Sequence, residues 1–334
     1  MTGTGAAFIN IYQGVIIMKK KILALFLAVL MVLALCACQS ATDDTYTVGI
    51  CQLVQHDALD AATNGFKDAL TTALGDKVTF EEQNASGEPT NCTTIINGFV
   101  SNNVDLIMAN ATAPLQAAAS ATDTIPVLGT SVTDYASALE IDGWTGTVGG
   151  NISGTSDLAP LDQQAAMIQE LFPDAKTVGL LYCSAEPNSQ YQVDVITGYL
   201  EELGLTCTPF AFTDTNDVAS VTQAACDSSD VIYIPTDNTA ASNTEAIANV
   251  VLPAGVPVVA GEAGICNGCG VATLSIDYYD LGYITGEMAA KILTGEADIS
   301  EMAVEYAPEV TKMYNADNCT ALGITPPEGY EPLG

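Results

Sequence analysis

Short apolar runs alternate with segments of helical periodicity along most of this 334-residue chain. Residues 47–51 form a largely apolar run of strand length, and similar runs at 78–82, 105–109 and 125–128 predict three more strands. Apolar positions at helical spacing separate these runs: Leu59, Ala62, Phe66, Leu70 and Ala73, then Ile95, Ile96, Phe99 and Val100, then an Ala-rich segment from Pro114. The first half therefore reads as repeated β-α units.

The same order recurs in the second half, roughly 130 residues later. Runs at 177–181, 230–234 and 256–259 echo those at 47–51, 105–109 and 125–128. Helical periodicity lies between and around them, at 163–171, 191–203, 218–225 and 243–251. Strands that alternate with helices form parallel sheets with right-handed crossovers. We therefore predict an α/β fold with two doubly wound parallel-sheet lobes.

The candidate binding site is the set of loops that follow the predicted strands, because ligands bind beyond the carboxyl ends of strands in open parallel sheets. These loops are rich in hydroxyl, amide and carboxylate groups. The candidate ligand-binding residues are Gln55, His56, Thr112, Ala113, Thr133, Ser184, Asn188, Ser189, Thr236, Asp237, Asn238, Glu262 and Asp277. The same residue types cap helices in any α/β protein, so capping is the alternative for each loop.

The chain contains no arginine, which restricts how a charged ligand could be held. A ligand carboxylate would have to be held by main-chain N–H groups at helix N-termini, such as those near Thr112–Ala113 and Asn188–Ser189, by hydroxyl and amide side chains, or by a lysine. A ligand ammonium group would need a loop carboxylate, for which Asp237 and Glu262 are the first candidates and Asp277 the third. His56, the only histidine, is either a ligand contact or a solvated loop side chain.

Composition and motifs argue against several other functions. The formal charge is −32, and such an acidic surface repels nucleic acid and anionic lipid. A Ser-His-Asp hydrolase would have to use His56, and neither a Gly-x-Ser-x-Gly elbow nor a phosphate-binding Gly-x-x-x-x-Gly-Lys loop occurs. We predict a binding protein, not an enzyme, with no cofactor and no metal.

The N-terminal segment has the pattern of an export signal. Three lysines at 19–21 precede an apolar run over 22–35, and Leu35-Cys36-Ala37-Cys38 follows. This ending resembles the lipobox of bacterial lipoproteins, which implies a signal peptide over 1–38 and palmitate-type lipidation at Cys38. An uncut anchor helix is the alternative. Met18 is expected to be the initiator methionine. Residues 39–46 are predicted to be a linker. The chain after Cys38 contains five lysines and 40 acidic residues, which gives it a formal charge of −35.

Eight further cysteines follow the lipidation site, and export makes disulfides possible. Their spacing does not assign partners, since eight thiols allow 105 complete pairings. The pair Cys266 and Cys269 is interpreted as a local disulfide or as free thiols rather than as a metal site, because a metal would require a second such pair or histidines.

The chain from about 47 to 324 resembles the bacterial lipoproteins that serve ABC transporters as substrate-binding proteins of the tryptophan/tyrosine type. The matching words are Val54-Gln55-His56, Leu59-Asp60-Ala61-Ala62, Gln83-Asn84-Ala85, Gly149-Gly150-Asn151-Ile152-Ser153-Gly154-Thr155-Ser156-Asp157, Pro235-Thr236-Asp237-Asn238 and Ile276-Asp277-Tyr278-Tyr279-Asp280-Leu281-Gly282. Each of these sequence segments is weak evidence alone, but together they are specific to the family.

This resemblance implies a periplasmic-binding-protein type I fold, the two-lobed Venus flytrap. Three hinge segments would join an N-terminal lobe of 47–152 plus 278–304 to a C-terminal lobe of 153–277 plus 305–334, with crossings near 151–153, 275–277 and 305–307. The implied function is capture of an amino acid, aromatic in kind, and its delivery to an ABC permease with ATPase subunits. The implied location is the outer face of the bacterial cell membrane, through the lipid anchor alone. A sugar or nucleoside ligand, or a role as a surface sensor or adhesin, is the alternative on the same fold.

Overall fold

The computed structural model describes residues 45–333, which from Tyr46 onward form one compact unit. The predicted signal peptide, Cys38 and most of the predicted linker lie outside the described residues. Within the described part of the chain, no helix combines the length and apolar character that a membrane span requires.

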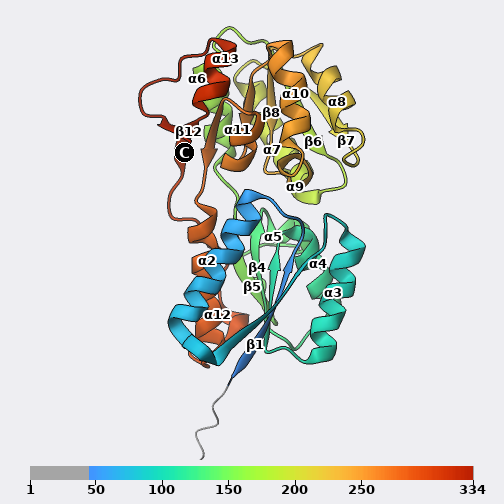
Figure 1. Ribbon diagram of the computed structural model, residues 1–334, viewed down its shortest axis with the longest axis vertical. Helices are drawn as coiled ribbons and strands as arrows, with labels where there is room; N and C mark the ends of the chain where they lie inside the picture. The colour runs from blue at the N-terminus through green and yellow to red at the C-terminus, as the bar shows by residue number, and fades with distance from the viewer. Residues whose placement is uncertain (1–44, 334) are drawn as a thin grey trace, which may run out of the picture. The chain divides into compact units, whose positions relative to one another are not determined.

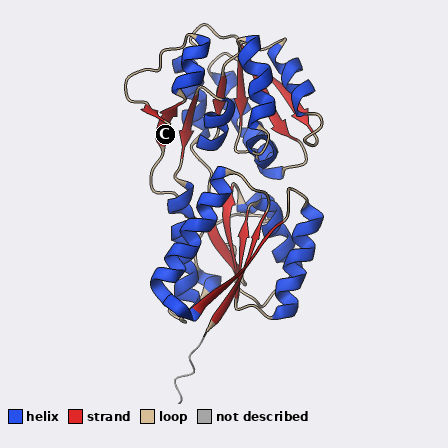
Figure 2. Cartoon of the chain, in the orientation of Figure 1, coloured by secondary structure: helices blue, strands red, loops and turns tan. Residues whose placement is uncertain are grey.

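Two sheets organise this unit, and both are built mainly from parallel strands (Figure 2). The first has the order β11-β5-β4-β3-β1-β2, and every pair in it is parallel. Its strands are β1 (Tyr46–Gln52), β2 (Val78–Asn84), β3 (Leu106–Asn110), β4 (Val127–Val132), β5 (Ile152–Ser156) and β11 (Glu305–Tyr306). This order places the carboxyl ends of β1, β3, β4 and β5 along one edge.

The second sheet has the order β13-β12-β10-β9-β8-β6-β7, with a single antiparallel pair, β10 with β12, among the described strands. Its strands are β6 (Thr177–Cys183), β7 (Thr206–Phe212), β8 (Val231–Ile234), β9 (Val258–Ala260), β10 (Ala272–Ser275), β12 (Thr311–Tyr314) and β13 (Glu331–Pro332). The predicted α/β fold with two parallel-strand sheets is therefore confirmed.

Helices cover both faces of each sheet and bury four apolar cores (Figure 1). The helices of the first sheet are α2 (Asp57–Leu74), α3 (Pro89–Asn102), α4 (Thr112–Ala121), α5 (Tyr135–Ala138) and α12 (Tyr278–Leu293). The helices of the second are α6 (Leu161–Leu171), α7 (Pro187–Glu202), α8 (Val218–Cys226), α9 (Asn238–Ala241), α10 (Thr244–Ala254), α11 (Ala263–Cys269) and α13 (Ala316–Leu322). Two 3-10 turns complete the set, Gly75–Lys77 and Ile299–Glu301.

The chain passes between the sheets three times: after β5, between β10 and α12, and between β11 and β12. Strands β5 and β11 pair within the first sheet up to Ser156 and Tyr306, so the first and third passages begin after these residues. The predicted crossings near 151–153 and 305–307 and the lobe boundaries at 152 and 304 stay predictions. A small fifth core, which includes Ala159, Ile276 and Tyr278, packs around the first two passages.

The contact between α2 and α12 depends on glycine. A Cβ atom placed on Gly282 would overlap the carbonyl oxygen of Ala62, and one on Gly65 would overlap that of Tyr279. The two helices therefore approach closely enough that backbone meets backbone. This contact holds the returning helix α12 against the first sheet.

We predict that Gly282→Ala lowers the free energy of unfolding by about 1–3 kcal/mol, because the added methyl group forces the helices apart. Gly98→Ala in α3 is the matched control: nothing lies within 4 Å of its added methyl group, so better helix propensity should raise stability by about 0.5–1 kcal/mol. Urea unfolding of both variants checks this. Two shifts of the same sign would contradict the packing assignment.

Candidate functional site

A cavity of about 470 Å³ lies between the carboxyl-end loops of the two sheets. This volume is within the range of about 300–1,000 Å³ that is typical of small-molecule sites. The residues that line it are Leu53, Val54, Ser86, Gly87, Glu88, Pro89, Ala113 and Gln116 from the first sheet's side, and Cys183, Ala185, Glu186, Pro187, Asn188, Thr213, Asp214, Thr215, Asn238, Thr239 and Ser242 from the second. None of these described lining residues is aromatic or cationic.

Glu186 organises one wall of this cavity. Its carboxylate accepts hydrogen bonds from the main-chain N–H groups of Asn238, at 3.0 Å, and Thr239, at 2.8 Å. The side chains of the same two residues donate to it as well, each at 2.7 Å. Glu186 therefore occupies the N-terminus of α9, so those amides are not available to a ligand carboxylate.

A hydrogen bond joins the two sides of the cleft at its inner end. The His56 Nε2 atom lies 3.3 Å from Asn238 Oδ1. Burial lowers the pKa of His56 below its usual value, although the bond to Asn238 acts in the opposite direction. His56 is therefore a neutral bridging group at physiological pH and supplies no positive charge to the cleft.

Next to this bridge lies a second cavity of only about 10 Å³. That is close to the space that one water molecule needs. Its lining residues are His56, Leu59, Asp157, Thr236, Asp237, Asn238, Ala241, Glu262 and Tyr278. The small cavity thus gathers three carboxylates and is large enough for one small polar group.

Asp157 is the least satisfied of these carboxylates. It is 3% exposed, and the Tyr278 hydroxyl donates to its Oδ2 atom at 3.0 Å, whereas Oδ1 has no hydrogen-bond partner. Burial raises the pKa of Asp157 to about 6. A buried carboxylate oxygen without a donor is costly, so an additional donor at Asp157 Oδ1 would be stabilising.

Asp237 and Glu262, the first candidates for an ammonium partner, are both helix N-caps in the structure. Asp237 is 1% exposed and accepts from the N–H groups of Ala240, at 2.8 Å, and Cys183, at 2.7 Å. Glu262 is 2% exposed and accepts from the N–H groups of Gly264 and Ile265. Burial raises the pKa of Asp237 to about 8 and that of Glu262 to about 7.

Asp277, the third candidate, is exposed and caps α12 by accepting from the Asp280 N–H group at 3.0 Å. It lines neither the large nor the small cavity but a separate hollow beside Asp57 and Gly264. Capping, the alternative that the sequence left open, therefore describes all three acids, although Asp237 and Glu262 also border the small cavity.

The other predicted residues divide into two groups. Ala113, Asn188 and Asn238 line the large cavity, and His56, Thr236 and Asn238 line the small one. Five line neither: Gln55, Thr112, Thr133, Ser184 and Ser189. Thr112 still bears on the site, because it is the first residue of α4.

The N-terminus of α4 is open. Its N-cap residue Ala111 offers no side-chain hydrogen bond and adopts φ 100°, a backbone conformation that a residue with a Cβ rarely takes. Strain of this kind persists where the surrounding structure imposes it, often at functional sites. The helix therefore directs uncapped N–H groups and its positive dipole end toward the cleft beside Ala113.

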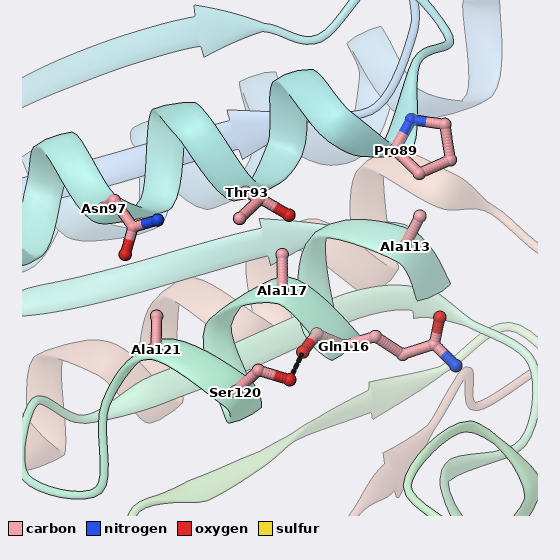
Figure 3. Close-up of a pocket in the computed structure, with 8 residues that line it drawn as sticks. All are labelled: Pro89, Thr93, Asn97, Ala113, Gln116, Ala117, Ser120 and Ala121. Atoms are coloured by element: carbon pink, nitrogen blue, oxygen red, sulfur yellow. Dashed lines mark hydrogen bonds between the residues drawn. The ribbon is translucent and has the colours of Figure 1, made fainter.

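The cleft continues outward over the first sheet's helices. Figure 3 shows a shallow groove of about 300 Å³ between α3 and α4, with Ala113, Ala117 and Ala121 along one side. Pro89, Ala113 and Gln116 line both this groove and the large cavity. The groove adds apolar surface at the mouth of the cleft but no charged group.

Asp157, Glu186 and the apolar pair Leu53 and Val54 are site residues that the loop analysis did not select. Asp157 belongs to one of the sequence segments on which the family resemblance rests. Residues 151–153 of the same segment were interpreted as a hinge. Recognising that run as strand β5 would have placed Asp157 at the carboxyl edge of the sheet. Among residues 45–333, no three His, Cys, Asp or Glu side chains are arranged so that they could hold a metal ion.

Comparison with known protein families gives one model that covers nearly all of the described chain. The model for ABC transporter substrate binding proteins matches residues 47–330. A tyrosine-binding protein of Clostridioides difficile is 33% identical over 280 residues, which cover 83% of this chain and 81% of that protein.

Two solved structures are similar at comparable identity. An ABC domain from Streptococcus pneumoniae in complex with L-Trp is 32% identical, with a TM-score of 0.82, and the match covers 86% of this chain and all of that one. A ligand-free, open substrate-binding protein with adhesive properties from Clostridium difficile is 35% identical, with a TM-score of 0.67, covering 86% of this chain and 99% of that one. The TM-score is thus higher against the L-Trp complex than against the open, ligand-free structure.

We predict that the ligand-free protein loses stability as the pH rises from 5 to 8. Asp157, Glu262 and Asp237 have pKa values of about 6, 7 and 8 when folded and about 4 when unfolded, so the folded chain binds more protons in this window. Because folding lowers the pKa of His56, this residue makes stability increase with pH, but only below about pH 6.5. Urea unfolding should show a loss on the order of 5–7 kcal/mol, of which Asp157 contributes the smallest share.

Asp157→Asn is the control for this pH dependence. It removes one of the three titrating groups while an oxygen remains to accept from Tyr278, so the loss between pH 5 and 8 should shrink. An unchanged pH dependence in Asp157→Asn would show that Asp157 does not titrate in this range.

Proposed function

The chain belongs to the family of ABC transporter substrate-binding proteins, and we propose that its ligand is a free aromatic amino acid: tyrosine, tryptophan or phenylalanine. It would carry this ligand to an ABC permease driven by ATPase subunits and catalyse no reaction. The observation that carries the ligand assignment is the unpartnered, buried oxygen of Asp157 beside a cavity with apolar walls. The L-Trp complex and the tyrosine-binding relative support it.

The small cavity is the proposed site of the ligand's ammonium group. Asp157 Oδ1 would accept one ammonium proton, and the negative potential of Asp237 and Glu262 would favour the positive charge. The main-chain N–H groups already bound to those two acids fix their positions. A positive charge here compensates three carboxylates that no lysine or arginine of the described residues approaches in either cavity.

The N-terminus of α4 is the proposed site of the ligand's carboxylate. The N–H groups of Thr112 and Ala113 follow the uncapped residue Ala111, and an anion is favourable at a helix N-terminus. The alternative predicted site near Asn188 and Ser189 is less suitable, because Glu186 already brings a negative charge there. Main-chain amides would thus take the role that arginine plays elsewhere.

The large cavity is the proposed site of the aromatic side chain. Leu53, Val54, Pro89 and Pro187 offer aliphatic surface to a flat ring, and burying a large apolar side chain contributes about 1.5–3 kcal/mol. Sugars usually stack on aromatic side chains, and none lines this cavity among the described residues. An amino acid therefore fits the lining better than a sugar or nucleoside does.

Members of this family work outside the cytoplasm, and we further propose that this one is a lipoprotein. Its signal peptide would end before Cys38, which would carry the lipid and hold the protein on the outer face of the cell membrane. The basic and apolar run before Cys38 supports this proposal. A second role as a surface adhesin is also proposed, because a relative that is 35% identical has adhesive properties.

We predict that Asp157→Asn weakens binding of the amino acid at pH 7.5 at least thirtyfold, since losing one partner of a buried charge pair costs about 2 kcal/mol or more. The same change should raise the melting temperature of the ligand-free protein, because it removes a buried charge. Calorimetric titration and thermal unfolding measure the two effects. Asp277→Asn, an exposed cap outside the cleft, is the matched control and should leave affinity unchanged.

A purely structural role for Asp157 would give a different result. Affinity and ligand-free stability would then fall together, and the assignment of Asp157 to the ammonium group would be wrong.

We also predict that tyrosine, tryptophan or phenylalanine at micromolar concentration raises the melting temperature of the wild-type protein by mass action. The effect should be larger at pH 8 than at pH 5, where Asp157 is protonated. Trp144 stacks on Tyr135, which bonds to the main chain of β5, so its fluorescence gives a second readout near the first hinge passage. Stabilisation by ribose or a nucleoside, and by none of the three amino acids, would refute the ligand class.

A further inference from the structure

Two buried thiols lie against each other beneath the wall of the cleft. Cys51 is next to the last residue of β1, and Cys92 is in the first turn of α3. Both side chains are fully buried in the same apolar core. Cys92 lies close enough to Cys51 that, together with burial, it raises the pKa of the Cys51 thiol.

The packing of α3 on β1 holds this pair in place. Gly49 and Cys51 lie on the same face of β1, since side chains alternate along a strand. Phe99, two turns after Cys92, presses on Gly49 so closely that a Cβ atom there would overlap its ring. Helix and strand are therefore in contact at two points, and the thiols meet at one of them.

The other buried thiols have different partners. Cys269 donates to the carbonyl oxygen of Ile265, Cys319 to that of Val271, both at 3.3 Å, and Cys183 to that of Thr213 at 3.7 Å. All eight cysteines of the described residues are free thiols in this structure, including Cys266 and Cys269. Among them, Cys51 and Cys92 differ from the rest because strand β1 and helix α3 place these two thiols next to each other.

We propose that Cys51 and Cys92 form a disulfide in the exported protein. The family works outside the cytoplasm, where disulfides persist. An exported oxidant that carries a disulfide would exchange with the two thiols: a Cys51–Cys92 sulfur–sulfur bond forms, both thiol protons are released, and two electrons reduce the oxidant to its dithiol. Because neither thiol is exposed in the folded chain, the exchange takes place before α3 packs on β1.

The bond would fix one wall of the large cavity. Leu53 and Val54 lie two and three residues after Cys51, and Ser86 to Pro89 precede Cys92. A disulfide here ties the end of β1 to the start of α3 and restrains the unfolded chain. The inference does not depend on the identity of the ligand.

Thiol counting on the full chain, purified from cells that export it, tests the proposal. The protein is denatured in excess N-ethylmaleimide with or without prior reduction, and intact mass gives the number of adducts. We expect two more adducts after reduction, and a peptide map that links Cys51 to Cys92. Reduction should also lower the melting temperature by about 5 °C or more.

Two variants control the experiment. Cys207→Ala removes a thiol outside the pair and should keep the difference of two adducts, whereas Cys51→Ala should expose Cys92 to the reagent without reduction. Equal adduct numbers before and after reduction of the wild-type chain would overturn the proposal. A disulfide that maps to another pair, such as Cys266 with Cys269, would overturn it as well.

Discussion

The cleft depends on one electrostatic constraint: it buries carboxylates in a chain that has no arginine. Asp237 and Glu262 are tolerated because main-chain N–H groups donate to them, whereas Asp157 accepts from the Tyr278 hydroxyl and has one oxygen without a partner. An unpaired buried charge costs several kcal/mol unless a partner arrives or a proton binds. The raised pKa values of these acids reflect the binding of a proton, and a ligand ammonium group would supply the charged partner.

Much of the architecture was predictable because parallel strands and their helices have strong periodic signals. Strands expected at 47–51, 177–181 and 230–234 occur as β1, β6 and β8, and the helix expected from the spacing of Leu59 to Ala73 occurs as α2. Once strands run parallel, their following loops must meet at one edge. The position of His56, Ala113 and Asn238 at the cleft could therefore be predicted from the sequence alone.

The rest could not be predicted, for physical reasons. A carboxylate that caps a helix and one that awaits a ligand look the same in sequence, so Asp237 and Glu262 could not be separated from Asp157. Strand β5 is buried but contains Ser, Gly and Thr, and it lacks the apolar signal of a strand. Strand β7 is an edge strand with mostly exposed residues, and β11 and β13 are only two residues long.

The same constraint links ligand charge to closure of the two lobes. Direct contact across the cleft includes the single long hydrogen bond between His56 and Asn238, which is weak support for a closed state. Closing also removes water from Asp157, and without a ligand that desolvation opposes closure. The proposed ligand ammonium group would reverse the sign of this effect, because its attraction to Asp157 is strongest where water is excluded. The ligand would therefore favour the closed state by differential interaction, as any conformational coupling requires.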